Sequence, residues 1–122
     1  MSTNASVHVK GTDGQVRSIY VHWDGYLSHV GKLLRDNYNT QDLADDLVHM
    51  GDCSSLEASL EDSTFYHRDR NEDWDDVQPT VSANLQNSLE ANSQSFDYYF
   101  EDGVWHLVAD GTAVPFSDVN LS

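Results

Sequence analysis

One short segment contains residue types that acid–base and metal chemistry use: His22, Trp23, Asp24, Gly25 and Tyr26. Imidazole and carboxylate groups serve as general bases and as metal ligands. His22 and Asp24, with His29, could therefore form a base and its orienting carboxylate, or half of a metal site. The alternative is structural: Trp23 fills the core, Gly25 adopts a positive φ, and Asp24 holds the turn through backbone hydrogen bonds. We favour the structural interpretation because the other histidines are dispersed along the chain.

Two arginines, Arg68 and Arg70, mark a second segment of interest. Guanidinium groups bind phosphate well, so this pair, together with His22 and Asp24, could capture or hydrolyse a nucleotide signal. The alternative, which we favour, is that the flanking acids neutralise the arginines through salt bridges. The acidic spacings over residues 69–76 do not match a calcium loop, because the glycine and the final glutamate of that loop are missing.

Negative charge is concentrated in the middle of the chain. The 122 residues include 21 acidic and 6 basic side chains, a formal net charge of −15. Residues 36–76 contain thirteen acids and two bases and so carry −11, whereas the other 81 residues share −4. The few basic residues are scattered, which argues against direct binding to nucleic acid or to an anionic membrane surface.

The acidic side chains of this segment form a candidate partner-binding surface: Asp42, Asp45, Asp46, Glu57, Glu61, Asp62, Asp69, Glu72, Asp73, Asp75 and Asp76. On a helix, residues three and four apart lie about 5–6 Å from each other, and each like-charged pair costs about 0.2–0.5 kcal/mol. Duplex DNA carries one charge per roughly 1.7 Å of its axis, so an array of carboxylates can imitate a phosphate strand. Two alternatives remain: general solubility or a salty environment, since Asp outnumbers Glu by 16 to 5, and a surface for divalent cations.

The order of predicted strands and helices indicates a single α+β domain over residues 1–122. We expect an antiparallel sheet that is built from N- and C-terminal hairpins and packed against two or three helices. Asp-Gly turns favour two hairpins, and apolar spacing predicts helices. We expect the helices to cover one face of the sheet. The predicted elements are strands at 7–10 and 16–23, a helix capped by Ser28, a helix from Thr40 to Gly51, a helix from Thr80 to the polar run 92–95, a hairpin over 96–108 and a short edge strand in the tail.

The single cysteine, Cys53, excludes an intrachain disulfide and a zinc site of several cysteines. No positive charge adjoins it, so we expect an inert thiol. The first residues lack the charged and apolar regions of a signal peptide, and no apolar run is long enough to cross a bilayer, so we expect a soluble intracellular protein. No catalytic motif stands out, and we expect no enzyme activity, metal or cofactor.

The motifs also carry a family resemblance. Several segments resemble a family of small uncharacterised phage and prophage proteins, which have a His-Trp-Asp-Gly-Tyr motif after an N-terminal hairpin. These segments are the stretch from Ser18 to Tyr26, the run from Val30 to Leu34, Tyr38, Gly51-Asp52 and the closing Asp102-Gly103-Val104-Trp105. Two positions depart from that pattern: Val21, where a cysteine is common, and Leu27, where a proline is common. The resemblance implies a viral accessory protein in the cytoplasm of an infected bacterial host, and it implies no reaction.

The sequence therefore predicts a small acidic phage protein that acts by protein–protein interaction. Our leading hypothesis is a DNA mimic of the anti-CRISPR or anti-restriction type, an inhibitor that evades host defence by blocking the groove of a basic nucleic-acid-binding protein: a nuclease, CRISPR effector or restriction complex. The alternatives are a nucleotide-signal-binding (sponge) protein or small hydrolase, and a virion-cycle protein without a charged partner. Exposed hairpin edges also make a homodimer plausible.

Overall fold

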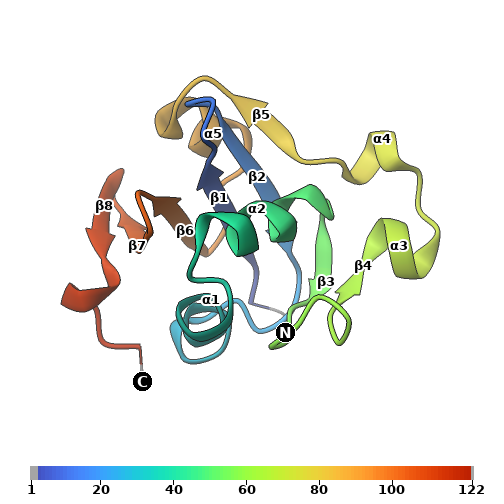
Figure 1. The fold of residues 1–122 in the computed structure, drawn as a ribbon, viewed down its shortest axis with the longest axis horizontal. Helices are drawn as coiled ribbons and strands as arrows, with labels where there is room; N and C mark the ends of the chain where they lie inside the picture. Colours follow the sequence, from blue (N-terminus) through green and yellow to red (C-terminus); the bar gives the residue numbers. More distant parts are fainter. Residues whose placement is uncertain (1–2, 122) are drawn as a thin grey trace.

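The computed structural model describes residues 3–121 and has an α+β fold built on an eight-stranded mixed sheet (Figure 1). The strand order is β4-β3-β2-β1-β6-β7-β8, and β5 pairs with β2 beside this path. The strands are β1 (Ala5–Lys10), β2 (Val16–Val21), β3 (Cys53–Ser55), β4 (Thr64–Phe65), β5 (Thr80–Ser82), β6 (Phe96–Glu101), β7 (Val104–Ala109) and β8 (Thr112–Pro115). The helices are η1 (Leu27–Gly31, a π-helical turn), α1 (Lys32–Asn37), α2 (Gln41–His49), α3 (Tyr66–Arg70), α4 (Trp74–Val77), α5 (Leu85–Ala91) and η2 (Phe116–Asp118, a 3₁₀ turn).

Both predicted hairpins are confirmed. Strands β1 and β2 pair antiparallel, as do β6 and β7, and the second hairpin turns through Asp102 and Gly103, which both adopt positive φ. The hairpins join through a parallel pairing of β1 with β6, which places the N-terminal strand near the middle of the sheet. The predicted edge strand in the tail is β8, which pairs with β7.

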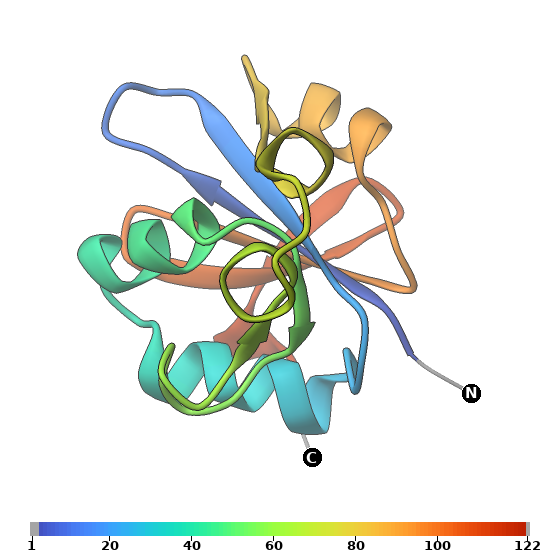
Figure 2. The same ribbon diagram turned by 90° about the vertical axis from the view of Figure 1, so that its right-hand side faces the viewer.

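The expectation that helices cover only one face of the sheet is wrong. Val7 and Val9 of β1 belong to the core that includes Leu47 of α2, whereas His8 points to the other face and reaches Ser88 of α5. Figures 1 and 2 show α1 and α2 on one side of β1 and β2 and α5 on the other. Because β1 is central and covered on both faces, its polar residues Ser6 and His8 are also buried.

Helix α2 begins and ends where the sequence predicts, whereas the helices before and after it begin at other residues than predicted. Helix α2 begins after Thr40, whose side chain accepts the Leu43 N–H, and ends before Gly51, which adopts a φ of +81°. The preceding helix starts as the π-helical turn η1 after Tyr26, so Ser28 is not its cap. The predicted third helix starts late because residues 80–82 pair with β2 as β5, and Asn84 caps α5.

Candidate partner-binding surface

The segment that follows β4 is irregular in sequence but well anchored. The Asp69 carboxylate accepts the Phe65 N–H at 2.8 Å, which closes the first turn of α3. Asn71 ends this helix in the left-handed region, and the Asp73 side chain caps α4 by accepting the Asp75 N–H. These local hydrogen bonds hold α3 and α4 on the side of the molecule that faces the viewer in Figure 2.

Acidic side chains on this segment and on the loop before β4 point into solvent without basic partners. We define the acidic surface as these seven residues: Glu57, Glu61, Asp62, Glu72, Asp73, Asp75 and Asp76. All except the half-buried Glu57 are exposed. Within residues 3–121, none of the seven has a basic side-chain nitrogen within 4.0 Å, and Asp69 alone among the eleven candidate acids forms an ion pair.

The three candidate acids of α2 form a second group. Asp42 and Asp46 are exposed, whereas Asp45 is half-buried and accepts a hydrogen bond from Gln41 at 2.9 Å. Asp45 also lines a shallow cavity with Arg17 of β2, so its charge is partly compensated within the chain. The helix thus presents two exposed carboxylates, fewer than its sequence pattern predicts.

The arginines are engaged by their own segment, as the structural alternative predicts for Arg68. Its guanidinium pairs with Asp69 at 2.9 Å, donates to the Ser63 carbonyl at 2.8 Å and lies over the Phe65 ring. Arg70 instead stacks on Tyr66, with its guanidinium carbon 5.3 Å from the ring centre. Both groups therefore stabilise α3.

The loop after β2 differs from the structural interpretation of its sequence. Trp23 is 45% exposed and does not fill the core, because β2 ends at Val21 and the alternation of its side chains stops there. The positive φ belongs to Asp24, at +56°, and not to Gly25. Gly25 is needed for another reason: a Cβ at this position would lie 2.8 Å from the Ala5 Cβ.

The candidate catalytic or metal-binding residues of this loop are not brought together. The His22 Nδ1 atom lies 2.6 Å from the Tyr20 hydroxyl, and the His29 Nε2 atom lies 3.3 Å from the Leu56 carbonyl oxygen. The Asp24 carboxylate accepts a hydrogen bond from the Tyr26 hydroxyl at 3.3 Å. Within residues 3–121, no group of three or more His, Cys, Asp or Glu side chains is arranged to hold a metal ion.

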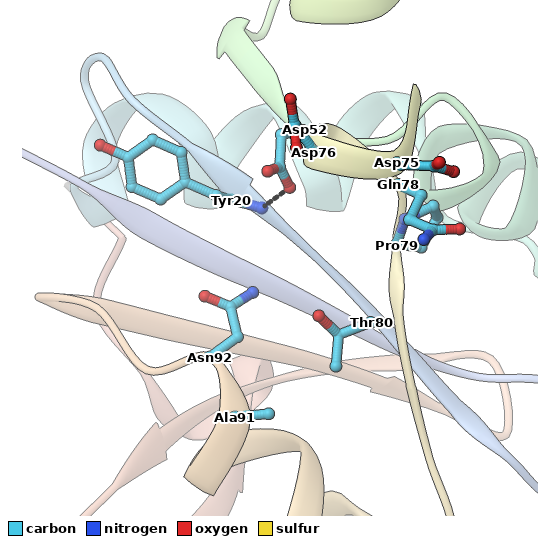
Figure 3. Close-up of a pocket in the computed structure, with 9 residues that line it drawn as sticks. All are labelled: Tyr20, Asp52, Asp75, Asp76, Gln78, Pro79, Thr80, Ala91 and Asn92. Atoms are coloured by element: carbon cyan, nitrogen blue, oxygen red, sulfur yellow. Dashed lines mark hydrogen bonds between the residues drawn. The ribbon is translucent and has the colours of Figure 1, made fainter. Parts of the chain in front are cut away.

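A cavity of about 440 Å³ opens between β2, α4 and the end of α5, and Figure 3 shows its lining. It is lined by Tyr20, Asp52, Asp75, Asp76, Gln78, Pro79, Thr80, Ala91 and Asn92. The lining contains three carboxylates and no lysine or arginine, so it disfavours a phosphate group. None of the four residues proposed for a nucleotide site lines it.

Of the three carboxylates that line this cavity, Asp52 is the one that the sequence did not single out as a site. Its carboxylate accepts the Tyr20 N–H at 2.9 Å, and burial raises its pKa to about 6 with a further contribution from the charge of Glu72. The sequence signal was limited to its place after Gly51 at the end of a helix. Its burial depends on Tyr20 and on residues 75–80, which lie far from it in the chain.

Comparison of the chain with protein-family models, with curated proteins and with solved structures gave no match in any of the three searches. None of the helices within residues 3–121 combines the length and apolar character needed to cross a membrane. A function for this protein therefore has to be inferred from its own sequence and structure.

Proposed function

We propose that this protein acts by binding, and that the acidic surface occupies the positively charged nucleic-acid groove of another protein. The observation that carries the proposal is the lack of compensation: seven carboxylates lie on one continuous stretch of chain, residues 57–76, and have no basic partner within 4.0 Å in residues 3–121. Like charges at this density destabilise the folded state. A basic partner would turn that repulsion into attraction.

The fold presents these charges in an ordered way. Asp69 and Asp73 are the acids that shape α3 and α4, and their hydrogen bonds leave Glu72, Asp75 and Asp76 pointing outward. A phosphate strand is also a fixed array of negative charges, and a fixed array loses little conformational entropy when it binds. Long-range attraction between such an array and a basic groove would steer the encounter and make it sensitive to salt.

The family resemblance of the sequence motifs provides a biological setting for this proposal. It suggests a phage accessory protein in the cytoplasm of an infected bacterium. The basic nucleic-acid-binding proteins that a phage gains from blocking are defence nucleases, so a restriction complex or CRISPR effector is the proposed partner. Inhibition would then require no catalysis by this chain.

Competition for DNA tests the proposal. A labelled duplex is bound to a panel of purified restriction complexes and CRISPR effectors, and release of the duplex is followed as the protein is added. The informative variant neutralises four exposed acids whose carboxylates form no hydrogen bond within residues 3–121: Glu61→Gln, Glu72→Gln, Asp75→Asn and Asp76→Asn. The matched control removes four acids elsewhere: Glu90→Gln, Asp102→Asn, Asp110→Asn and Asp118→Asn.

Both variants change the net charge equally, and asparagine tolerates the positive φ of Asp102 and Asp110. We expect the wild type and the control to displace DNA from at least one member of the panel, and the first variant to lose most of this effect. Equal loss in both variants would indicate a general charge effect and contradict the proposal. Failure of the wild type to displace DNA from any member would also contradict it.

A further inference from the structure

The loop between β2 and η1 presents two aromatic side chains to solvent. Trp23 is 45% exposed and Tyr26 is 40% exposed. The other large hydrophobic side chains exposed to this degree within residues 3–121 are aliphatic and lie singly on different elements: Leu43, Val81 and Val104. Two exposed aromatics three residues apart on one loop are therefore unusual for this surface, and tryptophan and tyrosine are among the residues most enriched at the hot spots of protein interfaces.

This loop is rigidly held although its side chains are exposed. The backbone N–H of Trp23 donates to the Ser54 carbonyl at 3.0 Å, and the backbone N–H of Gly25 donates to the Thr3 carbonyl at 2.8 Å. The buried Tyr98 hydroxyl donates to the Gly25 carbonyl at 2.7 Å. The backbone is thus fixed from the segment before β1, from β3 and from β6, so a partner would meet aromatic groups that lose little freedom on binding.

An acidic residue, Asp24, lies between the two aromatics in the sequence. Asp24 is exposed, and its left-handed conformation is fixed by the same hydrogen bonds. The Tyr26 hydroxyl donates to its Oδ1 atom at 3.3 Å. The Cα atoms of Trp23 and Asp24 are neighbours, about 3.8 Å apart as across any trans peptide. Both side chains are exposed, so one side chain of a partner can approach the indole and the carboxylate together.

We infer that Trp23 and Asp24 receive an arginine side chain of the partner, a refinement that rests on the proposed function. A guanidinium group stacks on an indole face and pairs with a carboxylate through two parallel hydrogen bonds, whereas a lysine ammonium is more strongly hydrated and offers only a point charge. Proteins that hold nucleic acid use arginine for phosphate contacts. The loop lies beside the chain segment that leads into Glu57, the first residue of the acidic surface, because the Trp23 backbone N–H donates to the Ser54 carbonyl and the His29 ring lies 3.3 Å from the Leu56 carbonyl oxygen.

Titration with oligo-arginine and oligo-lysine peptides of equal length tests this inference on the intact protein. Binding is followed by NMR through the indole N–H signal of Trp23, which is assigned by its loss in Trp23→Phe. We expect the arginine peptide to bind about two- to fivefold more tightly than the lysine peptide and to shift this signal. Trp23→Ala and Asp24→Asn should each remove that preference, whereas Val104→Ala, an equally exposed site on β7, should keep it.

The outcomes separate this inference from the proposed function. Equal affinity for the two peptides in the wild type, or a preference for arginine that survives Trp23→Ala, overturns the inference and leaves the acidic surface as the binding site. Binding of neither peptide contradicts both the inference and the proposed function. Loss of the preference in Val104→Ala as well as in Trp23→Ala would also overturn the inference, since the effect would not belong to the loop.

Discussion

The Nδ1 atom of His8 lies 2.6 Å from the Ser88 hydroxyl, which connects the central strand β1 to helix α5 on the face of the sheet opposite α2. The other ring nitrogen lies 2.8 Å from the Ser6 hydroxyl, which in turn donates to Asp97. His8 is fully buried, and burial lowers its pKa to about 4 against the opposing charge of Asp97. The imidazole is therefore neutral when the protein is folded at neutral pH.

His8 should make stability depend on pH. Its folded pKa of about 4 lies below the unfolded value of 6.5, so the unfolded chain binds more protons between these values. The free energy of unfolding should fall by about 3 kcal/mol through this group as the pH drops from 6.5 to 4. Urea unfolding at several pH values measures this, and His8→Gln should be less stable at pH 7 but flatter in its pH dependence. An unchanged slope in the variant would show that other groups control the effect.

Asp52 should act in the opposite direction. Its folded pKa of about 6 lies above the unfolded value of 3.8, so its contribution to stability is present below the lower value and is lost as the pH rises through the upper one. Asp52→Asn keeps an oxygen that can accept the Tyr20 N–H and removes the cost of ionisation. We expect a gain of about 1 kcal/mol at pH 7.5, discounted for the solvent that reaches this group, and none at pH 3.5. A variant less stable at both pH values would contradict this account.

Gly51 should be far less replaceable than Gly14, although both adopt a φ slightly above +80°. A Cβ at Gly51 would lie 2.6 Å from the Val77 carbonyl oxygen, whereas a Cβ at Gly14 would meet nothing within 4 Å. We expect Gly14→Ala to cost about 1 kcal/mol, from backbone conformation alone. Gly51→Ala should cost about 3 kcal/mol, since a clash adds to the strain. Equal losses in urea unfolding would show that the close approach at Gly51 relaxes freely.

Cys53 should be unreactive in the folded protein. The thiol is fully buried, and burial raises its pKa to about 12, so almost no thiolate exists at pH 8. We expect no colour with a thiol-specific disulfide reagent under native conditions and one equivalent after unfolding in urea. Rapid labelling of the native protein would show that β3 opens readily.

The parts of the fold that sequence predicts are those fixed by local signals. The Asp-Gly turn at residues 102–103 and the Thr40 cap each involve residues within a few positions of one another, and both are present as expected. Strands β3 and β4 are only two or three residues long and exist because Val21 pairs with Cys53 and Cys53 with Phe65. Such long-range pairing leaves no periodic pattern in a short segment.

In the candidate site, too, local features could be predicted from the sequence and long-range contacts could not. The density of acids is visible in the composition, but the composition does not show which carboxylates bind groups of their own chain. Asp69 and Asp73, for example, accept backbone N–H groups of Phe65 and Asp75. Trp23 was expected in the core because strand alternation was extended two residues beyond the end of β2. The burial of Asp52 depends on Tyr20, 32 residues earlier in the chain, and could not be predicted from its neighbours.

The association rate with the partner's nucleic-acid groove, measured as a function of salt, tests the central claim most directly. For the defence protein that the competition panel identifies, we expect the rate constant of the wild type to fall at least tenfold between about 50 and about 200 mM NaCl. Neutralising Glu61, Glu72, Asp75 and Asp76 should lower the rate at low salt and weaken this dependence, while the equally charged control follows the wild type. The same salt dependence in both variants would mean that the acidic surface does not guide binding.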